Sequence, residues 1–385
     1  MRKATLILGL ATFVFSSCSY LKKVQLLTGG SLKRTGFVQE IPFQYRKGLI
    51  VVEASINDDT TRREFIFDTG AFNSKIEKGL ANELGLEVIT TKENSTAQGN
   101  TQLIEVTRID SIRFGETAFY NIGAGKLQYS AKSYSPCVVK DGLIGSNLIK
   151  LAHWKIDYQN QKLYFSDTPF HPKVEDAAIL QFDRPLLSST PKVRLNIGEE
   201  KFAEILFDTG FNGGLVLPSS HVGLFSTSDA KVLIDRSTAG IYGSNTDTLI
   251  EKSLKVSFDN DEYHIPVEFS ALGKALVGND FLEHFTVFID NEINEITLLN
   301  KENVDVEPAL TFIPAILNDS LWIVNRIGVE HASIRLGDTL RSINGKRPHQ
   351  LFSNHCDHFL NIRELLAPNS LIIETVDHQI IQLYQ

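Results

Sequence analysis

The chain reads FIFDTG at residues 65–70 and ILFDTG at residues 205–210, so an apolar run ends twice in Asp-Thr-Gly. Apolar, β-branched and aromatic residues followed by a Gly-containing turn are typical of a strand that ends where the turn begins. The motif therefore predicts that Asp68 and Asp208 each lie at the end of a strand. A motif that occurs twice at the same local position indicates two related structural units.

Further matching segments follow in the same order in both halves of the chain. Residues 142–149 read GLIGSNLI, and residues 275–282 read ALVGNDFL. Between the blocks lie STAQG at residues 95–99 and STAG at residues 237–240. Three blocks in one order, with spacers that differ by only a few residues, indicate that residues 37–300 contain a duplicated unit.

Each unit is expected to consist mainly of short strands joined by Gly-rich turns. This pattern favours a closed or sandwiched β lobe over an α/β sheet. The expected strands are residues 49–56, 64–67, 162–165, 193–197, 203–207 and 295–299. Short helices are expected at residues 77–84 and 147–151.

The Asp-Thr-Gly turn has a chemical rationale. Glycine at positions 70 and 210 lets the backbone turn tightly beside the carboxylate, and the hydroxyls of Thr69 and Thr209 can brace the partner loop. When two such turns meet, their carboxylates cannot both ionise, so one proton is shared and the two pKa values separate by roughly 3 units. The ionised carboxylate can then take a proton from water, while the protonated one donates to a carbonyl oxygen.

The paired turns, each followed some 70 residues later by an apolar-apolar-Gly segment, resemble the aspartic peptidases over residues 37–300. The small size of the lobes is closer to the retroviral and bacterial retropepsin-like branch than to pepsin. The resemblance implies a catalytic dyad of Asp68 and Asp208, supported by Thr69, Gly70, Thr209 and Gly210. It also implies a peptide or protein substrate, a monomeric enzyme and no cofactor.

The resemblance further implies a flap, a Gly-rich hairpin that lies between each turn and the later Gly segment. The flap candidates are Gln98 and Gly99 in the first unit, and Gly240 and Tyr242 in the second. A peptide in extended conformation is the expected substrate, because a cleft and flap can form hydrogen bonds with a strand.

Three alternatives remain beside a single-chain enzyme. Asp-Thr-Gly is also an ordinary turn sequence, because Asp and Gly are common turn formers. A non-catalytic relative could use the same cleft only to bind peptides. Two identical chains could pair their lobes, although the duplication makes this unnecessary.

Phe211 follows the second motif where the family usually has a small residue, so it either crowds a substrate subsite or indicates a lobe that has lost catalysis.

Beyond a charged linker at residues 301–308, the chain resembles a PDZ domain. Its characteristic segment is GDTLRSING at residues 337–345, followed by an expected helix at 354–366 and expected strands at 371–376 and 380–383. The resemblance implies a peptide-binding loop at Leu310, Thr311 and Phe312, although this loop lacks the family's glycines. The alternative is a PDZ-like unit that only packs against the peptidase lobes.

The N-terminus is typical of an export signal. Arg2 and Lys3 precede a short apolar run, which ends in Ser-Ser before Cys18. The cysteine's position resembles a bacterial lipobox, which implies a lipid-modified Cys18 and a tether over residues 19–36. The protein would then be anchored in the cell envelope of a Gram-negative bacterium, on the periplasmic face or the cell surface. The alternative is an ordinary secretory peptide that contains a cysteine.

Composition excludes several other functions. The 38 Lys plus Arg and 46 Asp plus Glu form no clustered basic footprint, so nucleic-acid binding is not expected. Cys137 and Cys356 are far apart in the sequence and belong to different units, so a scaffold held by a disulfide is not expected. His355, Cys356 and His358 match no usual zinc spacing, and no metal site is expected. The chain has no Gly-rich phosphate loop and no Gly-x-Ser-x-Gly motif.

The sequence therefore predicts a mainly β protein with two duplicated aspartic-peptidase-like lobes, related by a pseudo-twofold axis, and a PDZ-like domain. The expected divisions are a lipoprotein signal peptide (1–18), a tether (19–36), an N-terminal lobe (37–170), a C-terminal lobe (171–300) and the PDZ-like domain (301–385).

Overall fold

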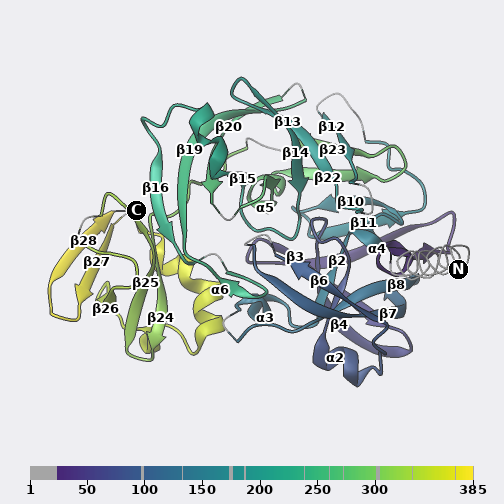
Figure 1. The fold of residues 1–385 in the computed structure, drawn as a ribbon, viewed down its shortest axis with the longest axis horizontal. Helices are drawn as coiled ribbons and strands as arrows, with labels where there is room; N and C mark the ends of the chain where they lie inside the picture. The colour runs from purple at the N-terminus through teal and green to yellow at the C-terminus, as the bar shows by residue number, and fades with distance from the viewer. Residues whose placement is uncertain are drawn as a thin grey trace, which may run out of the picture.

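The computed structural model describes residues 24–384, except 97, 98, 132, 173–176, 186, 187, 238, 260, 272, 301–303, 332 and 369. Strands dominate these residues (Figure 1), and the prediction of a mainly β protein is confirmed. Cys18 and the start of the expected tether lie outside the described residues. None of the helices in the described part of the chain is long and apolar enough to cross a membrane.

The first β unit, residues 31–166, carries the first Asp-Thr-Gly turn. Its elements are β1 (Ser31–Leu32), β2 (Val38–Arg46), β3 (Leu49–Ile56), β4 (Asp59–Phe67), β5 (Lys75–Glu77), α2 (Lys78–Glu83), β6 (Thr90–Ser95), β7 (Thr101–Phe114), β8 (Thr117–Leu127), α3 (Ser135–Val138), β9 (Gly142–Ile144), α4 (Ser146–Ile149), β10 (His153–Asp157) and β11 (Lys162–Ser166). β4 and β9 run parallel, with Ile66 opposite Leu143 and Phe67 opposite Ile144. The first motif and the later Gly segment are therefore neighbouring strands.

The second β unit, residues 177–300, repeats this arrangement. Its elements are β12 (Ala177–Asp183), β13 (Lys192–Ile197), β14 (Glu200–Phe207), β15 (Leu215–Pro218), η1 (Ser219–Leu224), β16 (Lys231–Asp235), β17 (Ala239–Gly240), β18 (Gly243–Ser244), β19 (Asp247–Phe258), β20 (Asp261–Ser270), β21 (Leu276–Val277), α5 (Asn279–Leu282), β22 (Phe285–Asp290) and β23 (Glu295–Asn300). β14 and β21 run parallel, with Leu206 opposite Leu276 and Phe207 opposite Val277. The duplicated sequence blocks thus adopt the same strand pairing.

The two β units share a sheet and a core. β10 of the first unit pairs antiparallel with β22 of the second, with Trp154 opposite Ile289. The sheet continues outward through β11 and β2 on one side and through β23 and β12 on the other. Buried apolar side chains from Phe37 to Val306 form one continuous cluster. Burial of this apolar surface is the main force that holds the two units together.

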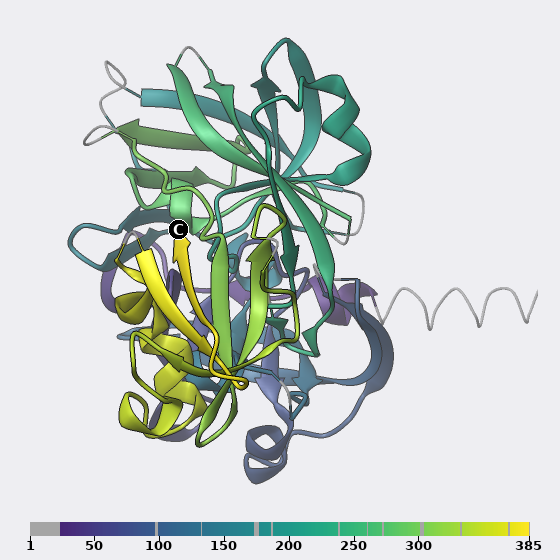
Figure 2. The same ribbon diagram turned by 90° about the vertical axis from the view of Figure 1, so that its left-hand side faces the viewer.

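The C-terminal unit, residues 304–384, has a separate core. Its elements are β24 (Phe312–Asn318), β25 (Leu321–Gly328), β26 (Thr339–Ile343), η2 (Pro348–Gln350), α6 (His355–Leu366), β27 (Ser370–Thr375) and β28 (Ile380–Tyr384). Trp322 is fully buried at the centre of this core. Figure 1 shows the unit at the left of the molecule, and Figure 2 shows it facing the viewer.

Contacts at β25 and at α6 join the C-terminal unit to the β units. β25 pairs antiparallel with β16, with Asp235 opposite Arg326, so the sheet of the second β unit continues into the C-terminal unit. Asp235 accepts a hydrogen bond from Nε of Arg326 at 2.8 Å, and both side chains are buried. The second contact is between α6 and α3 of the first β unit, where the rings of Tyr134 and Phe359 stack 4.8 Å apart.

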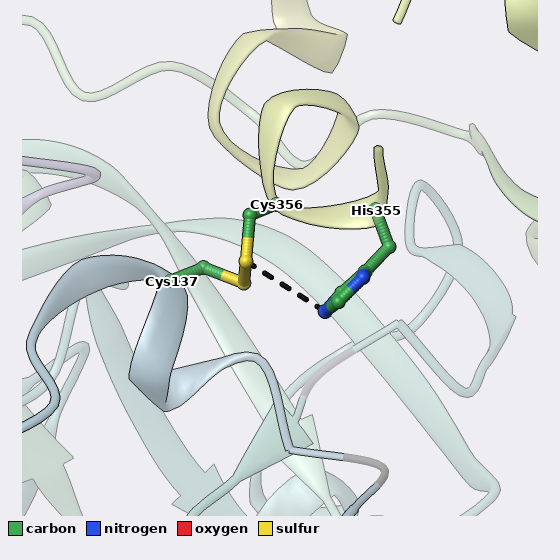
Figure 3. Close-up of side chains that lie close together, drawn as sticks. All are labelled: Cys137, His355 and Cys356. Carbon is green, nitrogen blue, oxygen red and sulfur yellow. Dashed lines mark hydrogen bonds between the residues drawn. A yellow bond between two sulfur atoms is a disulfide. The ribbon is translucent and has the colours of Figure 1, made fainter. Parts of the chain in front are cut away.

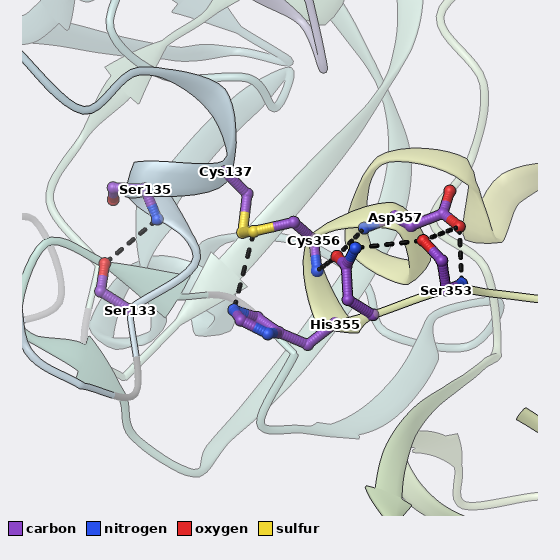
Figure 4. Close-up of a disulfide and its surroundings, with 8 residues drawn as sticks. Ser133, Ser135, Cys137, Ser353, His355, Cys356 and Asp357 are labelled. Atoms are coloured by element: carbon purple, nitrogen blue, oxygen red, sulfur yellow. Dashed lines mark hydrogen bonds between the residues drawn. A yellow bond between two sulfur atoms is a disulfide. The ribbon is translucent and has the colours of Figure 1, made fainter. Parts of the chain in front are cut away.

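The expectation that no disulfide holds the scaffold is wrong. Cys137 on α3 is bonded to Cys356 on α6, although 219 residues separate them in the sequence (Figure 4). The packing of α6 on α3 brings the two residues together, and sequence distance carries no information about that contact. A ring nitrogen of His355 and the two sulfurs lie within 4.8 Å of one another (Figure 3), but the sulfurs are bonded and cannot ligate a metal as thiolates.

The disulfide should contribute to stability. Cys356→Ser leaves the β16–β25 pairing in place but removes the covalent link between α3 and α6. We expect the free energy of unfolding to fall by about 2–4 kcal/mol, because the cross-link restricts the unfolded chain. Guanidinium denaturation of the oxidised wild type and the variant would measure this. Dithiothreitol should lower the wild-type midpoint to that of the variant and leave the variant unchanged; a wild type insensitive to reductant would contradict the prediction.

Candidate active site

The two predicted aspartates lie at the ends of matching strands. The backbone N–H of Asp68 donates to the carbonyl of Ile144 at 3.0 Å, and that of Asp208 donates to the carbonyl of Val277 at 2.9 Å. Each parallel strand pair thus extends by one hydrogen bond into the Asp-Thr-Gly turn. The rigid sheet therefore fixes the backbone position of each aspartate. A site shared by two side chains requires such precise placement.

Four hydrogen bonds of two threonines hold the turns together. The hydroxyl of Thr69 donates to the carbonyl of Phe207 at 2.6 Å and accepts from the N–H of Thr209 at 3.0 Å. The hydroxyl of Thr209 donates to the carbonyl of Phe67 at 2.8 Å and accepts from the N–H of Thr69 at 3.1 Å. Both threonines are almost fully buried. Each side chain therefore satisfies backbone groups of the other unit where water cannot replace it.

The glycines of the two turns allow the carboxylates to meet. A Cβ on Gly70 would lie closer than 3.0 Å to the carboxyl group of Asp208, and a Cβ on Gly210 would lie equally close to that of Asp68. Each carboxyl group thus occupies the space that a side chain at the partner's glycine would fill. The N–H of Ala71 donates to Asp68 at 2.7 Å, and the N–H of Gly210 donates to Asp208 at 2.9 Å.

The two carboxyl groups titrate differently. Burial raises the pKa of Asp68, while the charge of Lys75, the N–H of Ala71 and a hydrogen bond with Asp208 counteract the rise. The pKa of Asp208 lies well above its ordinary value, because burial and the negative charge of Asp68 both raise it. The charge of Lys75 thus favours the ionised form of Asp68, and the negative charge of Asp68 favours the protonated form of Asp208.

Residues of α4 and α5 brace the turns from behind, and sequence reasoning missed them. The hydroxyl of Ser146 donates to the carbonyl of Thr69 at 2.5 Å. The amide of Asn279 donates to the carbonyl of Thr209 at 2.8 Å and to that of Gly48 at 2.7 Å. The sequence did contain a signal for these residues, because a polar residue directly follows Gly145 in GSN and Gly278 in GND.

Phe211 is accommodated by two glycines. Its backbone carbonyl accepts from the N–H of Asn279 at 2.9 Å. A Cβ on Gly213 or on Gly278 would come closer than 3.0 Å to the Phe211 ring. The glycines that follow the second motif thus make room for the bulky side chain, which lines the cavity beside the carboxyl groups.

Segments of both units meet at the expected flap position. The side-chain amide of Asn94, on β6, donates to the hydroxyl of Tyr242 at 2.8 Å. The hydroxyl of Ser133 donates to the carbonyl of Gly240 at 3.0 Å. Gly99 forms the turn after β6 with φ +76°, whereas Gln98 lies outside the described residues. The β17–β18 hairpin is therefore held by the first β unit from two sides.

A cavity of about 850 Å³ contains both carboxyl groups and extends to the C-terminal unit. Its size is within the range of small-molecule and cofactor sites. Leu310 lines this cavity, but Thr311 and Phe312 are buried. The carbonyl of Thr311 accepts from the N–H of Gly328 at 2.7 Å, and Phe312 belongs to the core of the C-terminal unit. Of the three expected PDZ-type binding residues, only Leu310 faces open space.

Comparisons with known proteins agree with the first half of this geometry. Residues 52–148 match the family model of the aspartyl proteases. The chain carries an aspartyl-protease-like domain. The matched span contains Asp68 but ends before Asp208. None of the curated proteins matches the chain. The crystal structure of basic 7S globulin from soybean aligns with 68% of this chain and 94% of that chain, at 10% identity and a TM-score of 0.40.

The threonine hydroxyls of the aspartyl-protease-like domain and its partner unit should matter for stability. Thr69→Ala leaves the buried carbonyl of Phe207 and the N–H of Thr209 unpaired, so we expect a loss of about 1–3 kcal/mol in the free energy of unfolding. Thr69→Ser keeps the hydroxyl and serves as the matched control, with a smaller loss. Chemical denaturation would measure both; equal losses in the two variants would show that the methyl group matters and the hydroxyl does not.

Proposed function

We propose that the protein is an aspartic endopeptidase in which Asp68 and Asp208 of one chain share the catalytic proton. The observation that carries this proposal is the face-to-face placement of the two carboxyl groups, each beside the glycine of the opposite turn. A module that only binds peptides has no physical need for a half-buried and a buried carboxyl group that face each other across the two turns. Burial of such a pair opposes folding, which favours a catalytic role.

The two aspartates would have distinct roles in hydrolysis. Asp68, whose ionised form the charge of Lys75 favours, takes a proton from a water molecule that attacks the scissile carbonyl carbon. Asp208, which holds its proton, donates it to the carbonyl oxygen. The N–H groups of Ala71 and Gly210 keep the carboxyl groups oriented while the proton moves. Thr69 and Thr209 act only on the geometry of the turns, because their hydroxyls bond the backbone.

The substrate would be a peptide in extended conformation. The site lies in a cavity between two β units, below hairpin segments whose backbone groups can pair with a strand. The cavity continues to β24 and α6 of the C-terminal unit, where Ile313, Phe359 and Ile362 line it. We propose that this unit is PDZ-like and that it binds a further part of the peptide.

We also propose that the enzyme works in the cell envelope, anchored by a lipid on Cys18. The Cys137–Cys356 disulfide supports export, because structural disulfides form and persist in oxidising compartments. The charged residues, apolar run and small residues before Cys18 support processing at that cysteine.

Removing either carboxylate should abolish hydrolysis. Asp68→Asn and Asp208→Asn should each lose cleavage of a mixed peptide library, and the double variant should show no further loss, because the pair acts as one unit. Near-full turnover in either single variant would contradict the shared dyad, and a fully inactive wild type that still binds peptides would favour the non-catalytic alternative.

The Asp208→Asn variant should also be more stable than the wild type at neutral pH. The pKa of Asp208 is raised in the folded state, so its stabilising contribution is complete below the unfolded pKa and is lost as pH rises through the folded value. Asparagine does not ionise and avoids this loss. Thermal unfolding at pH 4 and pH 7 would test the sign: the advantage of the variant should grow with pH, and an advantage confined to pH 4 would contradict it.

Because both turns lie in one chain, one statine-type transition-state mimic should bind per polypeptide. Isothermal titration calorimetry would give the stoichiometry, and activity per chain should not fall on dilution. Half-occupancy, with activity lost at low concentration, would instead show that two chains form the site.

A further inference from the structure

A buried lysine lies beside one of the two carboxyl groups. Lys75 begins β5, seven residues after Asp68, and only 6% of the residue is exposed. Its Nζ donates to the carbonyl of Asn73 at 3.4 Å, a long hydrogen bond. Among the described residues, no carboxylate forms an ion pair with Lys75 at 4.0 Å or less. Burial of an ammonium group without an ion pair opposes folding. A lysine at this buried position therefore indicates a functional role.

Strand register places Lys75 on the same face of the sheet as Asp68. Lys75 lies opposite Leu143 on β9, and Leu143 lies opposite Ile66 on β4. Directly opposed residues share a face, and Ile66 shares its face with Asp68 because side chains alternate along a strand. Consistent with this register, all four side chains line the cavity of the carboxyl groups.

At the corresponding position, the second β unit has an aliphatic residue instead of a cation. There the residue opposite Leu276, which corresponds to Leu143, is Val216 on β15. The duplicated architecture therefore carries a positive charge on one side of the pair and an aliphatic side chain on the other. The carboxyl groups of Asp68 and Asp208 therefore experience different electrostatic fields.

Lys75 and Asp68 affect each other's pKa. Burial lowers the pKa of Lys75, and the charge of Asp68 raises it. In turn, the charge of Lys75 is the largest influence that lowers the pKa of Asp68. Other ionisable groups line the cavities from neighbouring elements, namely Lys92 and Glu93 on β6, Tyr129 after β8, Asp208 after β14 and Lys274 before β21. Asp68 is the group whose charge raises the pKa of Lys75.

We infer that Lys75 is a positioning residue that makes Asp68 the ionised member of the pair and leaves the shared proton on Asp208. The inference rests on the proposed function, because it assigns the base and the acid of that reaction. Without Lys75, the pair would be nearly symmetric, and Asp68 would ionise only at higher pH. The lysine thus extends the acidic end of the working pH range.

The test compares pH profiles of kcat/KM for the wild type, Lys75→Met and Lys75→Arg. Methionine has a similar length without the charge, and arginine retains the charge. We expect the acid limb to move to higher pH by about one unit in Lys75→Met, so that kcat/KM falls about tenfold below the limb and little on the plateau. Lys75→Arg should restore the wild-type limb. Lys126→Met is the matched control: Lys126 is also buried, but its Nζ donates to Asn82 at 3.3 Å, and it lines neither cavity.

Several outcomes would overturn the inference. An unshifted acid limb in an active Lys75→Met variant would show that Lys75 does not set the protonation state. A higher KM at every pH, without a shifted limb, would make Lys75 a contact for substrate instead. An equal shift in Lys126→Met would make the effect a general one of net charge.

A second measurement separates this inference from the proposed function. Titration of ¹³C-carboxyl-labelled aspartate by NMR needs no turnover and follows the pair directly, with Asp68→Asn and Asp208→Asn for assignment. A lower ionisation midpoint for Asp68 in the wild type than in Lys75→Met supports the inference even if no peptide is cleaved. Identical midpoints overturn it even if cleavage is observed.

Discussion

The reciprocal hydrogen bonds of Thr69 and Thr209 are the constraint on which the rest of the site depends. Each hydroxyl bonds a carbonyl and an N–H of the opposite turn, so neither turn has a complete hydrogen-bond set alone. The two turns can exchange these hydrogen bonds only if they face each other in nearly equivalent positions about a pseudo-twofold axis. Glycine at positions 70 and 210 then becomes obligatory, because each faces the opposite carboxyl group. Contact between the carboxyl groups is thus a consequence of how the threonines satisfy the backbone.

The parts of this arrangement that depend on local pattern could be predicted from the sequence. Strand β3 has the predicted bounds, and β14 and α6 agree with prediction to within a few residues, because apolar periodicity and turn residues determine such elements locally. The sequence did not predict that β4 pairs with β9, but the recurrence of both blocks in the second unit is matched by the same pairing of β14 with β21. The disulfide could not be predicted, because it depends on the packing of α6 against α3, which no local pattern encodes. The bracing amide of Asn279 was visible in the repeat but had no assigned partner until the fold placed it behind Thr209.

Divergence between the two units has a pattern of its own. The threonines that bond across the two turns are the same in both units, whereas two of the positions that face the cavity differ. Ala71 corresponds to Phe211, and Lys75 corresponds to Val216. Backbone hydrogen bonds require identical chemistry from both turns, but a peptide that crosses a twofold axis presents different groups to the two sides. Such an asymmetric lining would suit the directional peptide substrate that we propose.

The C-terminal unit is coupled to this frame through α3. The segment that contains α3 bonds the second flap at one end, where Ser133 donates to Gly240. The adjacent Tyr134 packs on α6, and Cys137, further along the segment, is cross-linked to that helix. A movement of α6 would therefore reach the β17–β18 hairpin through the three residues that separate Ser133 from Cys137. The same helix lines the cavity that contains Asp68 and Asp208, so a peptide lying along α6 would contact the site both directly and through the flap. The disulfide restrains this segment, which touches both the C-terminal unit and the flap.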